Sequence, residues 1–82
     1  MADAREPYLV QVNAIDVLND GEKVVTKAWL NIYYISRLCE VQNNMRHYEA
    51  GARWCAVLVN GAAVYVDDDD CEKIIINING SY

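Results

Sequence analysis

The stretch from Trp54 to Asp67 reads WCAVLVNGAAVYVD. Its two apolar runs flank Asn60-Gly61, and an Asn-Gly pair between such runs is the strongest short-range signal for a β-hairpin. We predict a type I′ turn, because both central residues of that turn need a positive φ, which Asn and Gly adopt most readily. Counting outward from this turn, the predicted pairs are Val59 with Ala62, Val57 with Val64 and Cys55 with Val66.

The N-terminal third of the chain predicts a second hairpin. From Tyr8 to Leu18, apolar and polar residues alternate with period 2, as in a half-buried strand. The apolar phase switches near Ile15, and a β-bulge or a bend at a barrel corner would explain that switch. Asn19-Asp20-Gly21 is a turn signal, and Glu22–Leu30 resumes the strand pattern.

The middle of the chain interrupts the strand pattern twice. Ile32 and Ile35 lie three residues apart, which predicts a single helical or 3₁₀ turn before a strand from Ile35 to Gln42. The segment Gln42–Arg53 is mostly polar, and we expect it to be the longest loop. Loops of this length are often functional or mobile.

Two interpretations of the C-terminal segment stay open. Asp69 followed by Glu72 resembles a capping box, and this favours a helix from about Asp69 to Ile78 that stops at Asn79-Gly80. One apolar stripe at helical spacing supports the helix and comprises Cys71, Ile74, Ile75 and Ile78. The alternative is a strand, because β-branched residues favour strands and some of the isoleucines alternate with period 2.

Together these elements predict an α+β or mostly β fold. We expect a small antiparallel β-roll, or a partly open barrel, of four to six strands with one short C-terminal helix. Residues 8–82 are predicted to form a single small domain. Residues 1–7 are predicted to be a flexible N-terminal arm, because polar termini are poorly ordered unless they are tied down.

Composition narrows the classes of function. The 82 residues are 54% hydrophobic and carry twelve acidic against seven basic side chains, for a formal charge of −5. Such a chain is too apolar to be disordered, and its acidity argues against binding nucleic acid through the phosphates. It lacks the long apolar run of a membrane span and the apolar stretch of a secretory signal near Met1. We therefore expect a cytoplasmic protein, in the host cytoplasm if it is viral, with its three cysteines reduced.

The residues able to carry chemistry match no catalytic or metal-binding motif. Calcium-binding loops place their acids at alternate positions, whereas the acids of Asp67–Asp70 are contiguous. Zinc sites use closely spaced ligand pairs, which are missing among the remaining candidates, Cys39, His47, Cys55 and Cys71. We predict no metal, no cofactor and no enzyme activity. The aspartate run is expected to be either a solvated helix corner or an acidic patch for a basic partner.

Tyrosine and tryptophan supply the candidate binding residues. The chain has six Tyr, two Trp and no Phe, a composition typical of interfaces, because the polar tips of Tyr and Trp tolerate partial exposure. The predicted partner-binding residues are Tyr33, Tyr34, Tyr48 and Trp54, together with Asp67, Asp68, Asp69 and Asp70. The alternative for the aromatic residues is ordinary core packing with hydrogen-bonded polar tips.

Two resemblances bear on architecture and origin. The segments Trp29-Leu-Asn-Ile-Tyr-Tyr-Ile35, Ala56-Val-Leu-Val-Asn-Gly61, Val64-Tyr-Val66 and Asp68 to Ile75 resemble FlbD-type flagellar proteins and related small β domains. That resemblance implies a small antiparallel β-roll closed by a helix, and no functional residue is carried over from it. In gross character, a small acidic chain without motifs is also similar to phage-encoded inhibitors of host defence, such as anti-CRISPR proteins.

We predict a non-catalytic protein-binding module. Its acidic corner and exposed aromatic residues would hold a protein partner with a basic surface. A phage- or mobile-element-encoded inhibitor of a host protein fits this description. The alternative is a structural or regulatory module that self-associates, for example as a homodimer, through its apolar sheet faces.

Overall fold

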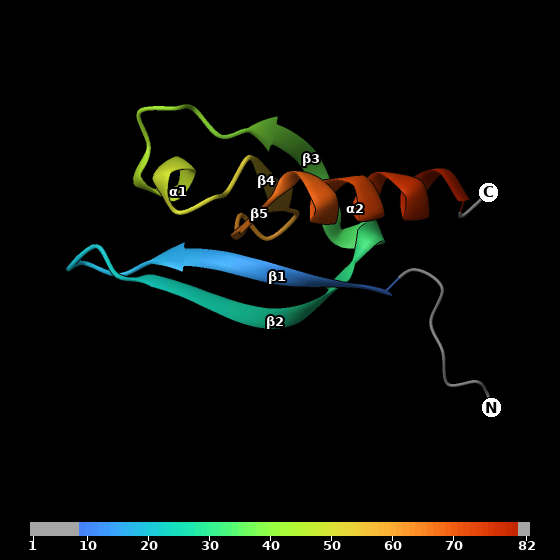
Figure 1. Ribbon diagram of the computed structural model, residues 1–82. Helices are drawn as coiled ribbons and strands as arrows, with labels where there is room; N and C mark the ends of the chain where they lie inside the picture. The colour runs from blue at the N-terminus through green and yellow to red at the C-terminus, as the bar shows by residue number, and fades with distance from the viewer. Residues whose placement is uncertain (1–8, 81–82) are drawn as a thin grey trace.

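Two antiparallel sheets and a C-terminal helix make up residues 9–80, the part of the chain that the computed structural model describes (Figure 1). The strands are β1 (Leu9–Val17), β2 (Lys23–Asn31), β3 (Ile35–Glu40), β4 (Trp54–Leu58) and β5 (Ala63–Val66). The helical elements are η1 (Ile32–Tyr34), α1 (Arg46–Glu49) and α2 (Asp68–Gly80). The predicted mostly β, α+β architecture is confirmed, and residues 9–80 contain no closed barrel. The predicted flexible arm, residues 1–7, lies outside the described residues.

The two sheets meet without a shared hydrogen-bond ladder. β1 pairs with β2, and β3-β4-β5 form the other sheet; β1 lies beside β5 but does not pair with it. In Figure 1 the β1–β2 ribbon runs under the three-stranded sheet, and α2 extends along both. The main core fills the space between them and contains Val10, Val12, Leu30, Ile32, Ala56, Val66, Cys71 and Ile74.

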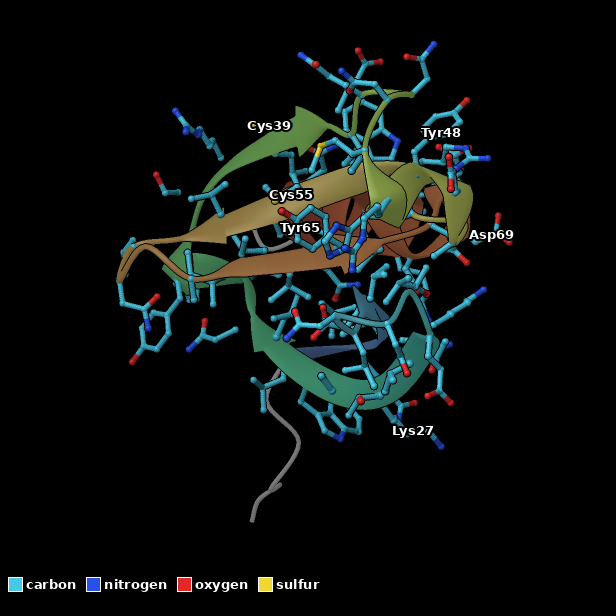
Figure 2. The ribbon with its side chains drawn as sticks, turned by 90° about the vertical axis from the view of Figure 1, so that its left-hand side faces the viewer. Lys27, Cys39, Tyr48, Cys55, Tyr65 and Asp69 are labelled. Atoms are coloured by element: carbon cyan, nitrogen blue, oxygen red, sulfur yellow. The ribbon has the colours of Figure 1, made fainter. Side chains whose placement is uncertain are left out.

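The β1–β2 ribbon carries no bulge. Its register is unbroken from the Leu9–Asn31 pair to the Val17–Lys23 pair, so of the two explanations for the phase switch near Ile15, a bulge or a bend, the bulge is wrong. The curvature of β2 in Figure 2 reflects the strong twist of a two-stranded ribbon. Ile15 lies on the opposite face of β1 from Val10 and Val12, and it joins a second, smaller core with Val41 and Ala52.

Both hairpins close with the same three-residue loop. At the β4–β5 end, Gly61 N–H donates to the Leu58 carbonyl at 2.9 Å, and Leu58 N–H donates to the Ala62 carbonyl at 2.8 Å. The corresponding distances in the β1–β2 loop are 2.8 Å from Gly21 N–H to the Leu18 carbonyl and 2.9 Å from Leu18 N–H to the Glu22 carbonyl. Gly61 and Gly21 have φ of +90° and +89°, as in a type I turn that ends in a left-handed glycine.

The predicted type I′ turn is therefore wrong, and so is the pairing derived from it. Among residues 9–80 no residue other than glycine has a positive φ, whereas type I′ would require one at Asn60. The Asn60 side-chain oxygen instead accepts the Ala62 N–H at 2.9 Å, a local bond that favours the right-handed conformation. The observed pairs, each shifted by one residue, are Trp54–Val66, Cys55–Tyr65, Ala56–Val64 and Val57–Ala63.

The segment predicted as one long loop contains a helical turn. Residues Arg46–Glu49 form α1. Val41, which precedes the predicted loop segment, and Ala52, near the end of that segment, are buried. A four-residue helix is too short to show helical periodicity in a sequence. The predicted turn before Ile35 is confirmed as η1, whose Tyr33 N–H donates to the Asn31 side chain at 2.9 Å.

The C-terminal segment is a helix, so the strand alternative is wrong. Its N-cap is Asp67, two residues before the predicted cap: the Asp67 carboxylate accepts the Asp70 N–H at 2.8 Å. Cys71 and Ile74 are buried and Ile78 is half-buried, as the stripe predicts. Ile75 lies at the edge of the stripe and is 42% exposed.

The loop geometry predicts that two neighbouring substitutions both destabilise the fold, for different reasons. Gly61→Ala should lower the free energy of unfolding by about 1–2 kcal/mol, because an L-residue is strained at this φ although the space beside Gly61 is open. Asn60→Gly should lower it by about 0.5–1 kcal/mol, because glycine loses the side-chain bond and adds unfolded-state entropy. Urea unfolding monitored by circular dichroism measures the free energy of unfolding of both variants. An increase in stability for Asn60→Gly would contradict the observed loop conformation and support a type I′ turn.

Candidate functional site

The four consecutive aspartates divide into two that serve the fold and two that face solvent. Asp67 caps α2, and Asp70 is buried. Asp68 is exposed and accepts the Trp54 indole N–H at 2.8 Å. Asp69 is also exposed and lies at the periphery of the molecule in Figure 2. The acidic corner that a partner can reach is therefore smaller than the sequence suggests.

Asp70 links α2 to the edge of β1. Its side chain is the one buried polar side chain among residues 9–80, with 4% relative exposure. One carboxylate oxygen accepts the Asn13 N–H at 2.8 Å, and the other lies 3.3 Å from Lys73 Nζ. In a capping box the third helical residue reaches back to the N-cap N–H, whereas Asp70 reaches across to another element. This bond fixes the position of the helix relative to the first hairpin.

Tyr33 and Tyr34 lie on the surface where β2 passes into β3. Their relative exposures are 65% and 59%. Val59, at the tip of the β4–β5 hairpin, is 68% exposed, and its N–H donates to the Tyr34 carbonyl at 2.8 Å. Tyr33, Tyr34 and Val59 are thus three exposed residues whose backbones are adjacent, and we call them the tyrosine patch. Val59 was not predicted as a binding residue, because the type I′ register would have placed it inside the ladder.

The other two predicted aromatic residues lie elsewhere. Tyr48 is half-buried on α1, with the Arg53 guanidinium 3.8 Å from its ring centroid. Trp54 is half-buried against the main core and is held by Asp68. In Figure 1, α1 and η1 lie at opposite ends of the three-stranded sheet, so the structure does not bring Tyr48 together with the tyrosine patch.

The α1 segment is attached to the first hairpin by its basic residues. The Arg46 guanidinium donates to the Leu18 carbonyl, at the turn of the β1–β2 hairpin. The His47 ring stacks on Tyr65 with 3.8 Å between centroids, and His47 Nε2 lies 3.6 Å from the Asp16 carboxylate. The histidine is thus engaged in packing between α1, β5 and β1.

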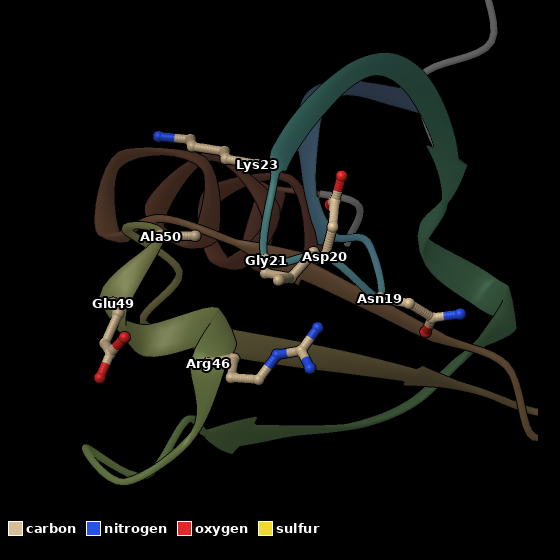
Figure 3. A pocket seen from close by; sticks show the side chains of 8 residues that line it. Asn19, Asp20, Gly21, Lys23, Arg46, Glu49 and Ala50 are labelled. Atoms are coloured by element: carbon tan, nitrogen blue, oxygen red, sulfur yellow. The ribbon is translucent and has the colours of Figure 1, made fainter.

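A cavity of about 620 Å³ separates α1 from the β1–β2 turn (Figure 3). Its charged lining consists of two acids, Asp20 and Glu49, and two bases, Lys23 and Arg46. Because these charges cancel, the lining of the cavity favours neither an anionic nor a cationic ligand. We assign it no ligand.

Cys55, Cys71 and Tyr65 lie in surroundings that raise their pKa values and favour the protonated form. Burial, followed by the neighbouring Cys39, raises the pKa of the Cys55 thiol, and Cys39 lies opposite Cys55 across the β3–β4 ladder. Burial, followed by Cys55, raises the pKa of Tyr65. Burial and then Asp68 raise the pKa of Cys71. A protonated thiol is a poor nucleophile and a poor metal ligand, so neither Cys55 nor Cys71 is activated here.

Residues 9–80 contain no cluster of three or more His, Cys, Asp or Glu side chains placed to hold a metal ion. None of the helices within this range is long and apolar enough to cross a lipid bilayer.

No protein-family model, curated protein or solved structure matches this chain. The resemblance to FlbD-type domains stays a prediction from sequence.

The role of Asp70 predicts unequal effects within the aspartate run. Asp70→Ala should lower the free energy of unfolding by about 2–3 kcal/mol, because it leaves the Asn13 N–H without its acceptor. Asp69→Ala is the matched control and should change stability by less than about 0.5 kcal/mol, because Asp69 is exposed. Urea unfolding of both variants measures the difference, and equal effects would contradict the structural role of Asp70.

Proposed function

We propose that this chain is a non-catalytic protein-binding module whose partner docks on the tyrosine patch. The observation that carries the proposal is that Tyr33, Tyr34 and Val59 are each more than half exposed, with Val59 joined to Tyr34 by a backbone hydrogen bond. Tyrosine contributes a large, rigid contact area with a polar tip, and it is enriched among the residues that dominate binding energy. Two adjacent tyrosines more than half exposed on an 82-residue chain are better explained by a partner than by folding.

The charge of the chain supports a partner with a basic surface. The first turns of α2 present Asp68, Asp69 and Glu72 to solvent, and the formal charge of the whole chain is −5. Such a field raises the rate of encounter with a basic protein, while desolvated aromatic contacts slow dissociation. The acidic corner thus favours the approach and the tyrosine patch holds the complex. Inhibition of a host defence protein is a narrower prediction that rests on composition alone.

Self-association is the second candidate, and the exposed apolar side chains favour it. Ile75 and Ile76 on α2, and Val25 and Trp29 on β2, are all more than 40% exposed. Sedimentation velocity over a wide concentration range separates the two candidates. A monomer that forms a stoichiometric complex with a foreign protein supports the binding module, and a stable homo-oligomer supports self-assembly.

Substitution of the patch tests the proposed function directly. A partner captured from a cell lysate would be purified and its affinity measured for wild type and for Tyr33→Ala/Tyr34→Ala. The double variant should bind at least about thirtyfold more weakly, because hot-spot tyrosines contribute about 2 kcal/mol or more to binding. The control variant Asn43→Ala/Asn44→Ala alters two exposed residues outside the patch and should bind like wild type. Unchanged affinity in the tyrosine variant would overturn the proposal, as would turnover of a small molecule with no stoichiometric partner.

A further inference from the structure

The backbone of β2 presents an open hydrogen-bonding edge. In an antiparallel ladder, directly opposed residues either exchange hydrogen bonds or both point their N–H and C=O groups outward. The Asn13 N–H points away from β2, toward Asp70, so the Asn13–Lys27 pair is of the outward type. The unbroken register extends this result to alternate residues of β2, whose N–H and C=O groups therefore face away from β1: Lys23, Val25, Lys27, Trp29 and Asn31.

No element among residues 9–80 covers this edge. β2 pairs with β1 alone, and no hydrogen bond within the described part of the chain reaches the outward groups of β2. The edge is nine residues long. β3 also has an open edge, but β3 has six residues and an irregular register between Ile35 and Arg37, which makes it a poorer template for another strand. The long regular edge is therefore that of β2.

The side chains on this edge combine two lysines with two exposed apolar groups. Lys23 and Lys27 are exposed, and they lie four residues apart on one face, about 14 Å along the strand. Val25 and Trp29 share that face with exposures of 52% and 64%. Figure 2 shows Lys27 on the outside of the ribbon, away from the core. The edge is locally basic although the whole chain is acidic.

We propose that β2 binds an extended segment of a protein partner, which adds to the β1–β2 sheet as an antiparallel third strand. Backbone hydrogen bonds supply affinity in this mode of recognition, and alternate side chains supply specificity. Acidic side chains of the segment would lie opposite Lys23 and Lys27, and apolar ones opposite Val25 and Trp29. Read from its N-terminus, the segment has the pattern apolar-x-acidic-x-apolar-x-acidic. This inference goes beyond the proposed function, because it assigns a second surface and the chemistry of its ligand.

Charge argues for an acidic partner segment over a second copy of the chain. In a two-fold symmetric dimer, β2 would pair antiparallel with β2 of a second copy. If the two-fold axis passes at Lys27, that lysine lies opposite Lys27 of the other copy, and if it passes at Val25, Lys23 lies opposite Lys27 of the other copy. Like charges directly opposed destabilise a ladder, and lysines at edges are a common device against self-pairing. Two-fold registers centred on Thr26 or Ala28 keep the lysines apart, so self-pairing is one outcome that the experiment has to detect.

Amide chemical shifts of ¹⁵N-labelled protein, titrated with a blocked peptide, test the proposal. The peptide is Val-Thr-Glu-Thr-Val-Thr-Glu, and a control peptide carries Lys in place of Glu. The acidic peptide should shift the amides of Lys23, Val25, Lys27 and Trp29 with millimolar affinity. The variant Lys23→Glu/Lys27→Glu should bind the acidic peptide about tenfold more weakly and the basic peptide about tenfold more tightly, because both cross-strand charge pairs are reversed. Lys27 is exposed, whereas Lys23 also lines the cavity beside α1 with Asp20 and Glu49, so circular dichroism verifies that this variant retains the fold and the single variant Lys27→Glu serves as its control.

Two further measurements test whether the peptide binds by strand pairing and whether it binds at β2. A peptide N-methylated at the amides that face β2 should lose binding, since strand pairing needs those donors; equal binding would mean charge attraction alone and would overturn the proposal. The variant Tyr33→Ala/Tyr34→Ala should bind the peptide like wild type, so failure at the tyrosine patch and failure at β2 are distinguishable. The proposal is also overturned if β2 amides do not respond to millimolar peptide, or if they shift with protein concentration alone, which would indicate self-pairing.

Discussion

The hydrogen bond from the Asn13 N–H to the buried Asp70 carboxylate joins segments 57 residues apart. A carboxylate with 4% exposure is stable only when its oxygens have partners, and here the partners are a β1 amide and Lys73. β1 and β5 are adjacent without pairing, so no backbone ladder joins the two sheets. The helix performs that function: it packs Cys71 and Ile74 on residues from both sheets and holds the edge of β1 through Asp70.

This one bond also determines which surfaces remain for partners. Because Asp70 binds the β1 edge, the first sheet is left with one open edge, that of β2. Because Asp67 caps the helix and Asp70 is buried, the acidic surface is reduced to Asp68, Asp69 and their neighbour Glu72. The tyrosine patch lies on the connection between the sheets, where η1 joins β2 to β3. Three surfaces of different chemistry are thus available on a chain of 82 residues: the open edge of β2, the acidic surface and the tyrosine patch.

Local patterns in the sequence were sufficient to predict the five strands, η1 and α2, but not the short helix α1 or the exact pairing of β4 with β5. Alternation gave both hairpins, and the isoleucine spacing gave the helix. Asn60-Gly61 is compatible with two turn types, and the one observed depends on a side-chain bond to Ala62 that no propensity specifies. The same limit applies to the aspartates, whose roles depend on Asn13 and Trp54, residues distant in sequence. The exposure of Val59 was missed because it depends on the register of the β4–β5 hairpin. The open edge of β2 was missed because it depends on the order of the strands in the sheets.

The most direct test of this account compares native-state hydrogen exchange at two amides that oppose each other across one ladder, Asn13 and Lys27. Both point outward from the β1–β2 ribbon, so the ribbon alone would leave both unprotected. We expect the Asn13 amide, bound by Asp70, to exchange at least about a hundredfold more slowly than the Lys27 amide, which should exchange at nearly the rate of an unstructured peptide. Equal rates would contradict it: if both amides exchange fast, Asp70 does not hold β1, and if both exchange slowly, the edge of β2 is already covered.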